Sequence, residues 1–139
     1  MSALLVLVLS LSLSLTAAAG AFRHDLSTDL VGWGFLNPNI SYDNRISNHF
    51  SLGADLSFNA KDLSDGIVLS PHLRYYPTGA FREGYLAQVG GYLPTEGDLL
   101  LEGGLGYSVW VDRMHLTPVG LVRHDLSWQI RLEIGYGWY

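Results

Sequence analysis

The chain has 139 residues, which is enough for one domain. Charged residues make up only 15% of it, against roughly 25% in ordinary soluble domains, and Lys61 is the single lysine among its eight basic residues. The net charge of −5 argues against a nucleic-acid partner, and without cysteine neither a disulfide framework nor a lipoprotein anchor is predicted. A water-facing surface normally mixes lysine and glutamate, so this composition indicates that much of the surface faces something else.

Residues 1–21 are predicted to be a signal peptide. Leu4–Leu15 is an apolar run that is too short to cross a bilayer as a helix, and the small residues at 16–21 fit the A-x-A cleavage rule. The run lacks the usual basic residues before it, so a buried strand or helix is the alternative interpretation. The domain itself is then expected at residues 22–139, in an exported protein.

Alternation of apolar and polar residues dominates the chain from residue 26 onward, which is typical of β-strands. In Phe50–Ala60, for example, Phe, Leu and Ala share one face while Ser, Gly, Asp and Asn share the other. Two segments fit less well, because 26–35 has no clean alternation and 114–122 contains Pro118. With turn residues as boundaries, the predicted strands are 26–35, 39–47, 50–60, 67–76, 81–93, 99–111, 114–122 and 126–138.

The predicted connections alternate in length. Tight turns are expected at 47–49, 76–80 and 111–113, and longer polar loops at 61–66 and 94–99. Short turns at one end and longer loops at the other are typical of bacterial outer-membrane barrels. The sequence therefore predicts an all-β, eight-stranded antiparallel up-and-down transmembrane β-barrel.

The composition of the polar faces favours a membrane barrel over a soluble one. These faces carry Gly, Ser, Asn and isolated charges of both signs, which suits the narrow interior of an eight-stranded barrel. A soluble barrel, with its apolar face inside, is the alternative. Aromatic residues near the strand ends are expected to form two interfacial girdles. They are Trp33, Phe35, Phe50, Phe58, Tyr75, Phe81, Trp128, Tyr136 and Trp138.

Two segments carry a resemblance to a known family. The last residues, "IRLEIGYGWY", resemble the C-terminal assembly signal of outer-membrane barrels, with Trp138 in the place that the terminal aromatic usually takes. Leu69–Tyr92 is similar to the central hairpin of an uncharacterised family of small eight-stranded outer-membrane proteins, of OmpA/OmpX-like architecture. The resemblance implies this fold, an outer-membrane location and recognition of the C-terminal strand by the barrel assembly machinery, but no established activity.

The inward faces are predicted to hold a polar network in the lumen. Since eight strands leave no room for an aqueous channel, we expect its charges to neutralise one another and plug the barrel rather than form a proton or ion path. The network is predicted to contain Asp29, Asp43, Arg45, Asp55, His72, Arg74, Arg82, Glu102, Arg131 and Glu133.

Catalysis is an alternative because lipid A deacylases and acyltransferases are small barrels that use Ser and His. Two pairs, His49/Ser51 and Ser70/His72, have the i, i+2 spacing that places side chains on one face of a strand. Neither pair is expected to face the outer leaflet, so no catalytic residue is predicted. The five histidines lack metal-ligand spacing, and neither a metal nor a cofactor is predicted.

The five residues "RHDLS" occur at 23–27 and again at 123–127. The residues that follow differ, so no module is duplicated. On a strand, Asp and Ser of each copy would point inward and His outward, which argues against a catalytic triad. The copies are predicted to begin strands at opposite ends of the seam between the first and last strands.

From these features we expect a monomeric outer-membrane barrel with a closed polar core and a structural or surface-interaction role. Its expected partners are outer-membrane lipid and lipopolysaccharide. The alternatives are a lipid A-modifying enzyme of deacylase or acyltransferase type, and then a soluble exported β-barrel that binds an apolar ligand.

Overall fold

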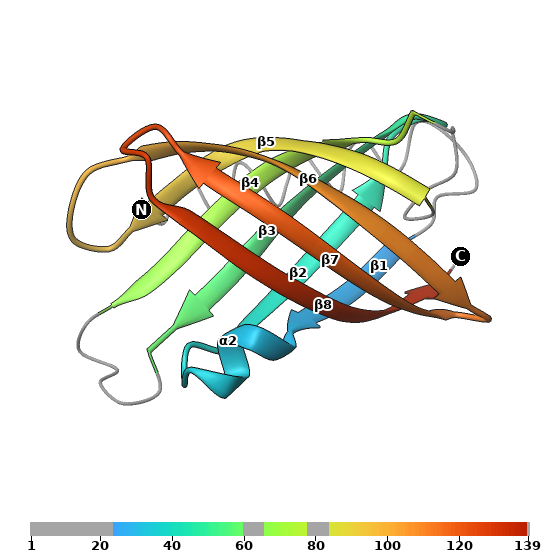
Figure 1. Ribbon diagram of the computed structural model, residues 1–139, viewed down its shortest axis with the longest axis horizontal. Helices are drawn as coiled ribbons and strands as arrows, with labels where there is room; N and C mark the ends of the chain where they lie inside the picture. The colour runs from blue at the N-terminus through green and yellow to red at the C-terminus, as the bar shows by residue number, and fades with distance from the viewer. Residues whose placement is uncertain (1–23, 60–65, 78–83, 139) are drawn as a thin grey trace.

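The computed structural model describes residues 24–59, 66–77 and 84–138. Its strands form one closed antiparallel barrel in chain order (Figure 1), which confirms the predicted all-β up-and-down architecture. The elements are β1 (His24–Asp29), α2 (Leu30–Gly34), β2 (Asn39–Arg45), β3 (Phe50–Phe58), β4 (Ile67–Tyr75), β5 (Gly84–Pro94), β6 (Leu100–Val111), β7 (Met114–Arg123) and β8 (Trp128–Trp138). The predicted signal peptide lies outside the described residues.

The barrel closes between its first and last strands. In the β1–β8 pairing, Asp25 lies opposite Gly137 and Asp29 opposite Glu133. Closure satisfies the backbone groups that an open sheet would leave at its two edges. Among the described residues, no helix is both long and apolar enough to cross a membrane.

The two ends of the barrel differ. One end, which we call the loop end, carries α2, the last residues of β3 and the connections at 95–99 and 124–127 (Figure 1). The other, which we call the turn end, carries the connections at 46–49 and 112–113 and the last residues of β4 and β8. Most of the predicted turn at 76–80 and of the predicted loop at 61–66 lies outside the described residues.

The prediction for the first strand, 26–35, is wrong in its second half, where the chain turns into α2. The Asp29 carboxylate accepts hydrogen bonds from the backbone N–H groups of Val31 and Gly32, both at 3.0 Å. An aspartate in this position caps the start of a helix. The chain leaves the helix through Leu36, whose φ of 58° lies in the left-handed region.

β7 continues through Pro118, which the sequence marked as an interruption. The β6–β7 register stays constant from Gly106 opposite Val119 to Val109 opposite Leu116. Proline has no N–H for the ladder. At this point the hydroxyl oxygens of Ser108 and Thr117 lie 2.7 Å apart inside the barrel and supply a hydrogen bond between the same two strands.

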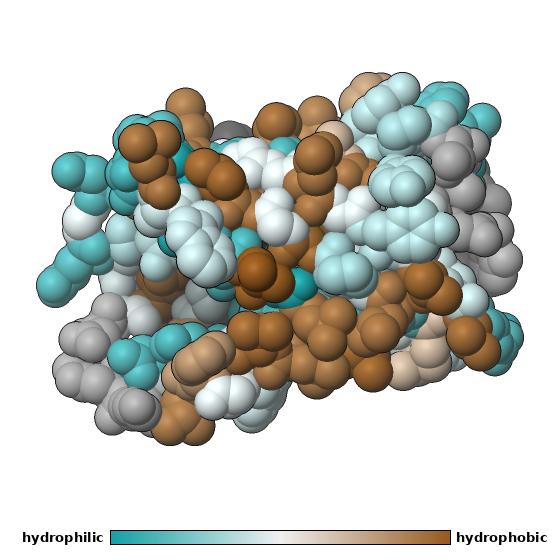
Figure 2. Space-filling model, viewed as in Figure 1, coloured by the Kyte–Doolittle hydropathy of each residue, from teal (hydrophilic) through white to brown (hydrophobic). Residues whose placement is uncertain are grey.

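The wall of the barrel separates apolar from polar side chains. Exposed apolar residues cover its outside, where Figure 2 shows a broad hydrophobic area along the middle and hydrophilic residues toward the ends. They include Leu26, Ile40, Leu56, Val89, Leu101, Leu105, Val109, Val111, Leu116, Val122 and Ile130. The buried residues are mostly polar or charged, and the buried apolar ones are Tyr76, Leu86, Val119 and Leu121. The interior is therefore less uniformly polar than the sequence suggested.

Candidate functional site

The centre of the lumen is organised around Arg74, which is fully buried. Its guanidinium donates through Nη1 to Asp43 Oδ2 at 2.9 Å and through Nη2 to Glu133 Oε1 at 2.7 Å. Its Nε donates to Gln88 Oε1 at 2.7 Å. A buried cation is stable only when opposite charges and acceptors replace its water, and Arg74 obtains both from strands β2, β5 and β8.

The same network continues toward the loop end through His72. The Nε2 atom of His72 lies 3.0 Å from Asp43 Oδ1, and its Nδ1 atom lies 3.7 Å from Asp55 Oδ2. Asp55 also forms an ion pair with Arg131. Carboxylates thus alternate with arginine and histidine side chains along the lumen, which lowers the electrostatic cost of burying the charged groups.

The Tyr76 phenol lies next to this network, at the turn end of the barrel. Its hydroxyl is 3.4 Å from Ser51 Oγ, which in turn donates to Asp43 Oδ1 at 3.1 Å. Burial and then the nearby Asp43 carboxylate raise the pKa of Tyr76 well above its ordinary value. The phenol is therefore neutral at physiological pH and closes this end of the network without adding charge.

The structure joins six of the ten residues predicted for the network by ion pairs or hydrogen bonds. They are Asp43, Asp55, His72, Arg74, Arg131 and Glu133.

Three of the other four have different partners. Glu102 forms an ion pair with Arg123, whose Nε lies 3.4 Å from Glu102 Oε2. Asp29 accepts from backbone N–H groups, including that of Leu132 at 2.9 Å. Arg45 donates to the Ser47 carbonyl at 3.0 Å and to Asn48. It is not in the network because β2 ends there and its long side chain reaches the turn. Arg82 lies outside the described residues.

A second buried cluster was not predicted. His115 places Nε2 2.9 Å from Asp25 Oδ1 and Nδ1 2.9 Å from Thr117 Oγ1, and the Trp110 ring lies against it with centroids 4.9 Å apart. The sequence contains a feature from which the inward position of His115 could have been predicted. The tight 112–113 turn fixes the register of β7 on β6, and this register directs His115 inward.

Neither candidate nucleophile–base pair forms. His49 lies with Nδ1 2.9 Å from the Tyr76 carbonyl oxygen, while Ser51 donates to Asp43. His72 contacts the carbonyl of Ser70 at 3.3 Å, and the Ser70 hydroxyl makes no hydrogen bond within the described residues. A nucleophile needs contact with its base, and both pairs lack it. Within the same residues, no group of three His, Asp or Glu side chains is placed to hold a metal ion.

The predicted aromatic residues occupy both ends of the barrel. Exposed rings at the loop end are Trp33, Phe35 and Trp128, and those at the turn end are Phe50, Tyr75 and Tyr136. Phe81 lies outside the described residues. The remaining two predicted residues, Trp138 and Phe58, are not among these exposed rings.

Those two are Trp138 and Phe58. Trp138 stacks on His24, with ring centroids 5.5 Å apart. Phe58 is half-buried and borders a cavity that opens at the loop end.

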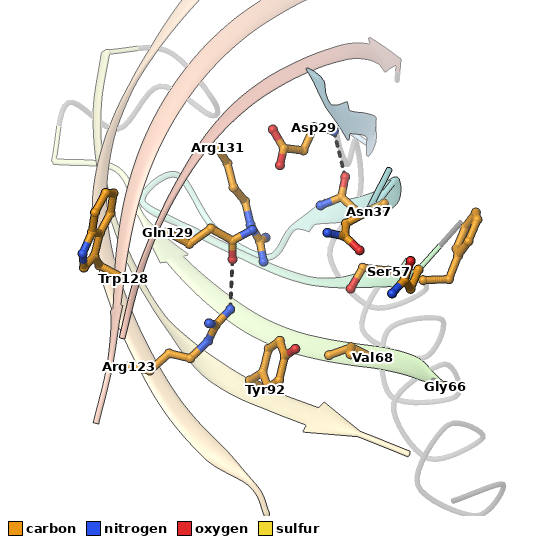
Figure 3. A pocket seen from close by; sticks show the side chains of 13 residues that line it. Asp29, Asn37, Ser57, Gly66, Val68, Tyr92, Arg123, Trp128, Gln129 and Arg131 are labelled. Carbon is orange, nitrogen blue, oxygen red and sulfur yellow. Dashed lines mark hydrogen bonds between the residues drawn. The ribbon is translucent and has the colours of Figure 1, made fainter. Parts of the chain in front are cut away.

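This cavity, which we call the loop-end cavity, has a volume of about 390 Å³. Figure 3 shows residues from several strands converging on it, with Arg131 and Gln129 from β8, Arg123 from β7 and Tyr92 from β5. Arg123 donates through Nη2 to Gln129 Oε1 at 2.9 Å and lies over the Tyr92 ring at 4.1 Å from its centroid. The sequence prediction did not include this cavity.

The second RHDLS copy forms a turn at the loop end instead of beginning a strand. Asp125 accepts from Ser127 N at 2.9 Å and from Ser127 Oγ at 2.5 Å, and these hydrogen bonds lower the pKa of its exposed carboxyl. The first copy does lie on a strand, with Asp25 and Ser27 buried. The same five residues therefore serve two different local structures.

Comparison of the chain with models of protein families, with curated proteins and with solved structures finds no match.

The packing of the lumen can be tested at Gly53 on β3. A Cβ there would lie 2.5 Å from the Tyr42 carbonyl oxygen and 2.6 Å from both Asp43 Oδ1 and His72 Nε2. Since such crowding displaces backbone, Gly53→Ala is expected to cost about 1–3 kcal/mol in the free energy of unfolding. Gly120→Ala on β7 is the matched control, because a Cβ there meets nothing within 4 Å. Equal unfolding curves for the two variants would contradict this close packing around Gly53.

Proposed function

We propose that the protein is a membrane-spanning barrel of the bacterial outer membrane, without catalytic activity, which serves as a structural or surface-interaction protein. One observation carries this proposal. The barrel is closed, its outer wall is apolar and its interior is charged and ion-paired. This is the polarity that lipid, and not water, requires outside a barrel.

The outward side of β6 illustrates the argument. Leu101, Leu105, Val109 and Val111 all face outward and are more than half exposed. Monomeric soluble proteins rarely expose contiguous apolar patches larger than a few hundred Å², and a band of such residues around the barrel exceeds what water would favour. In a bilayer the same residues are in their preferred solvent.

The interior argues against the soluble carrier. A soluble barrel that binds an apolar ligand needs an apolar lumen, whereas Arg74, Asp43 and Glu133 occupy the centre of this one. The loop-end cavity is bordered by two arginines and an aspartate. An apolar ligand would desolvate these charged groups without offering them any hydrogen bond, which is costly.

The outer membrane is proposed because closed barrels cross that membrane in bacteria and because the C-terminal strand resembles their assembly signal. In this placement the loop end faces the cell exterior and the turn end faces the periplasm. The exposed rings at the two ends, such as Trp128 and Tyr136, then lie at the two interfaces. Outer-membrane lipid and lipopolysaccharide are the expected neighbours, and the ion pairs of Arg74 keep the lumen closed to ions.

The proposal predicts how the protein behaves in cell fractions and on gels. It should fractionate with the outer membrane, and the folded protein should migrate differently on SDS gels before and after boiling, because a closed barrel resists SDS until heated. In planar bilayers the pure protein should give no stepwise ion conductance. Recovery as a soluble periplasmic protein would overturn the membrane assignment, and reproducible channel openings would overturn the closed lumen.

A further inference from the structure

We propose that the loop-end cavity binds a neutral saccharide of one or two sugar units. The inference concerns the interior of the folded barrel and does not depend on which solvent surrounds the outer wall. It is carried by the side chains that border the cavity, by their charge balance and by donors that they leave without a hydrogen bond.

Amide side chains dominate the polar part of the lining. Asn37, Asn39 and Gln129 border the cavity together with Ser57, and Figure 3 shows Asn37, Ser57 and Gln129 around it. An amide carries a donor and an acceptor side by side. A sugar hydroxyl also donates and accepts, so neighbouring hydroxyls of a sugar ring match such a lining better than a group that only accepts.

Aromatic rings supply the other surface that a sugar uses. Phe58 and Tyr92 border the cavity from β3 and β5, whereas the Trp128 ring on β8 is 71% exposed and turned away from it (Figure 3). One face of a sugar ring consists largely of C–H groups, which pack on the negative face of an aromatic ring. The Arg123 guanidinium covers one face of Tyr92 at 4.1 Å from the ring centroid, so a sugar would contact the rest of this ring.

The charges at the cavity are already compensated. Arg131 forms an ion pair with Asp55, and Arg123 forms one with Glu102 at 3.4 Å. Asp29 accepts from the backbone N–H groups of residues 31, 32 and 132. An anionic ligand would compete with Asp55 and Glu102 for the two guanidinium groups, so a neutral ligand fits the site better.

Two buried donors in the wall of the cavity make no hydrogen bond within the described residues. They are the Nε atom of Arg123, which faces Glu102 Oε2 only at the 3.4 Å distance of their ion pair, and the Nε atom of Arg131, which is itself only 3% exposed. Figure 3 shows both side chains pointing into the cavity. Buried donors without a hydrogen bond are rare and call for a specific explanation. Hydroxyl oxygens of a bound sugar would accept from them.

The size of the cavity limits the ligand. Its volume of about 390 Å³ lies near the lower end of the roughly 300–1,000 Å³ typical of small-molecule sites. A mono- or disaccharide fits this range, whereas a long chain would have to extend outward through the loop end.

The test is a binding measurement on the folded barrel in a detergent without a sugar headgroup. Glucose, galactose, N-acetylglucosamine and maltose are titrated by calorimetry, with inorganic phosphate as the anionic comparison. Binding of at least one neutral sugar, in the millimolar range or tighter, is expected, with no binding of phosphate. Binding of phosphate alone would overturn the proposal, as would the absence of binding by every sugar well above millimolar concentration.

Two tyrosines on β5 provide matched variants. Tyr92 borders the cavity, whereas Tyr85 is on the outer wall, 68% exposed and edge-on to Tyr107. Tyr92→Ala is expected to weaken sugar binding by about three- to tenfold, the loss of one aromatic contact, and Tyr85→Ala to leave it unchanged. The gel shift on boiling verifies that each variant is folded. Equal affinities for the two folded variants would show that the sugar binds elsewhere.

Discussion

Replacing Leu105 with arginine is expected to make folding into lipid vesicles less favourable by about 2–4 kcal/mol. Leu105 lies at the middle of β6, faces outward and is 73% exposed. If the outer wall faces hydrocarbon, an arginine at this depth has no water and no counter-charge, and it must distort the bilayer to reach either. Urea titration of the protein in vesicles measures the loss.

Leu126→Arg is the matched control. Leu126 is even more exposed, at 83%, but it lies in the 124–127 turn at the loop end. Its φ of 67° is equally strained for leucine and for arginine, so the substitution changes only polarity. The free energy of unfolding of Leu126→Arg is expected to differ from that of the unchanged protein by no more than about 0.5 kcal/mol. If Leu105→Arg were as harmless as Leu126→Arg, the outer wall would face water and the membrane proposal would fail.

The alternation of residue types was sufficient to predict the barrel. In β3 the polar residues Ser51 and Asp55 are buried while Leu56 is exposed, and the predicted strand at 50–60 differs from the observed one by two residues at its end. A period of two sets which side chains share a face. Because the chain has few charged residues for a water-facing surface, the polar face of each strand is then expected to be the buried one.

The prediction failed where a local interaction outweighed the pattern. Asp29 caps α2 through two backbone N–H groups, and this ends the first strand six residues early. Asp125 holds a turn in the same way through Ser127. In both places a short acceptor side chain competes with the sheet for backbone donors, an effect that apolar periodicity does not register.

The loop-end cavity could not be predicted from the sequence because closure of the barrel creates it. Asn39, Ser57, Tyr92 and Gln129 come from four strands and are far apart in the chain. Their distances depend on the tilt of the strands and on the stagger between them. Alternation predicts only that a side chain points inward, not which inward side chains meet at the same height.

Arg74→Met is expected to destabilise the barrel more than any of the other substitutions, with a loss of about 3–5 kcal/mol in the free energy of unfolding. Methionine keeps much of the volume but removes the cation that pairs with Asp43 and Glu133. Both carboxylates are buried, so each would be left with less compensation in a medium that solvates charge poorly. Unfolding in detergent or in vesicles measures the change.

Neutralising an acidic partner separates charge from packing. Adding Glu133→Gln to Arg74→Met removes one of the two carboxylates that pair with Arg74, and it is expected to restore part of the lost stability. Replacement of a buried ion pair as a unit costs far less than removal of one member. A double variant no more stable than Arg74→Met alone would mean that shape, and not charge, dominates at this position.

Replacing Arg45 with methionine, as a control for Arg74→Met, tests whether the lumen is closed. Arg45 donates only to the turn residues Ser47 and Asn48 at the end of β2, so Arg45→Met is expected to cost less than about 1 kcal/mol. A large difference between Arg74→Met and Arg45→Met means that the charges around Arg74 are shielded from water. Equal and small costs would mean that water replaces the lost cation inside the barrel, and the lumen would then be a solvated passage instead of a plug.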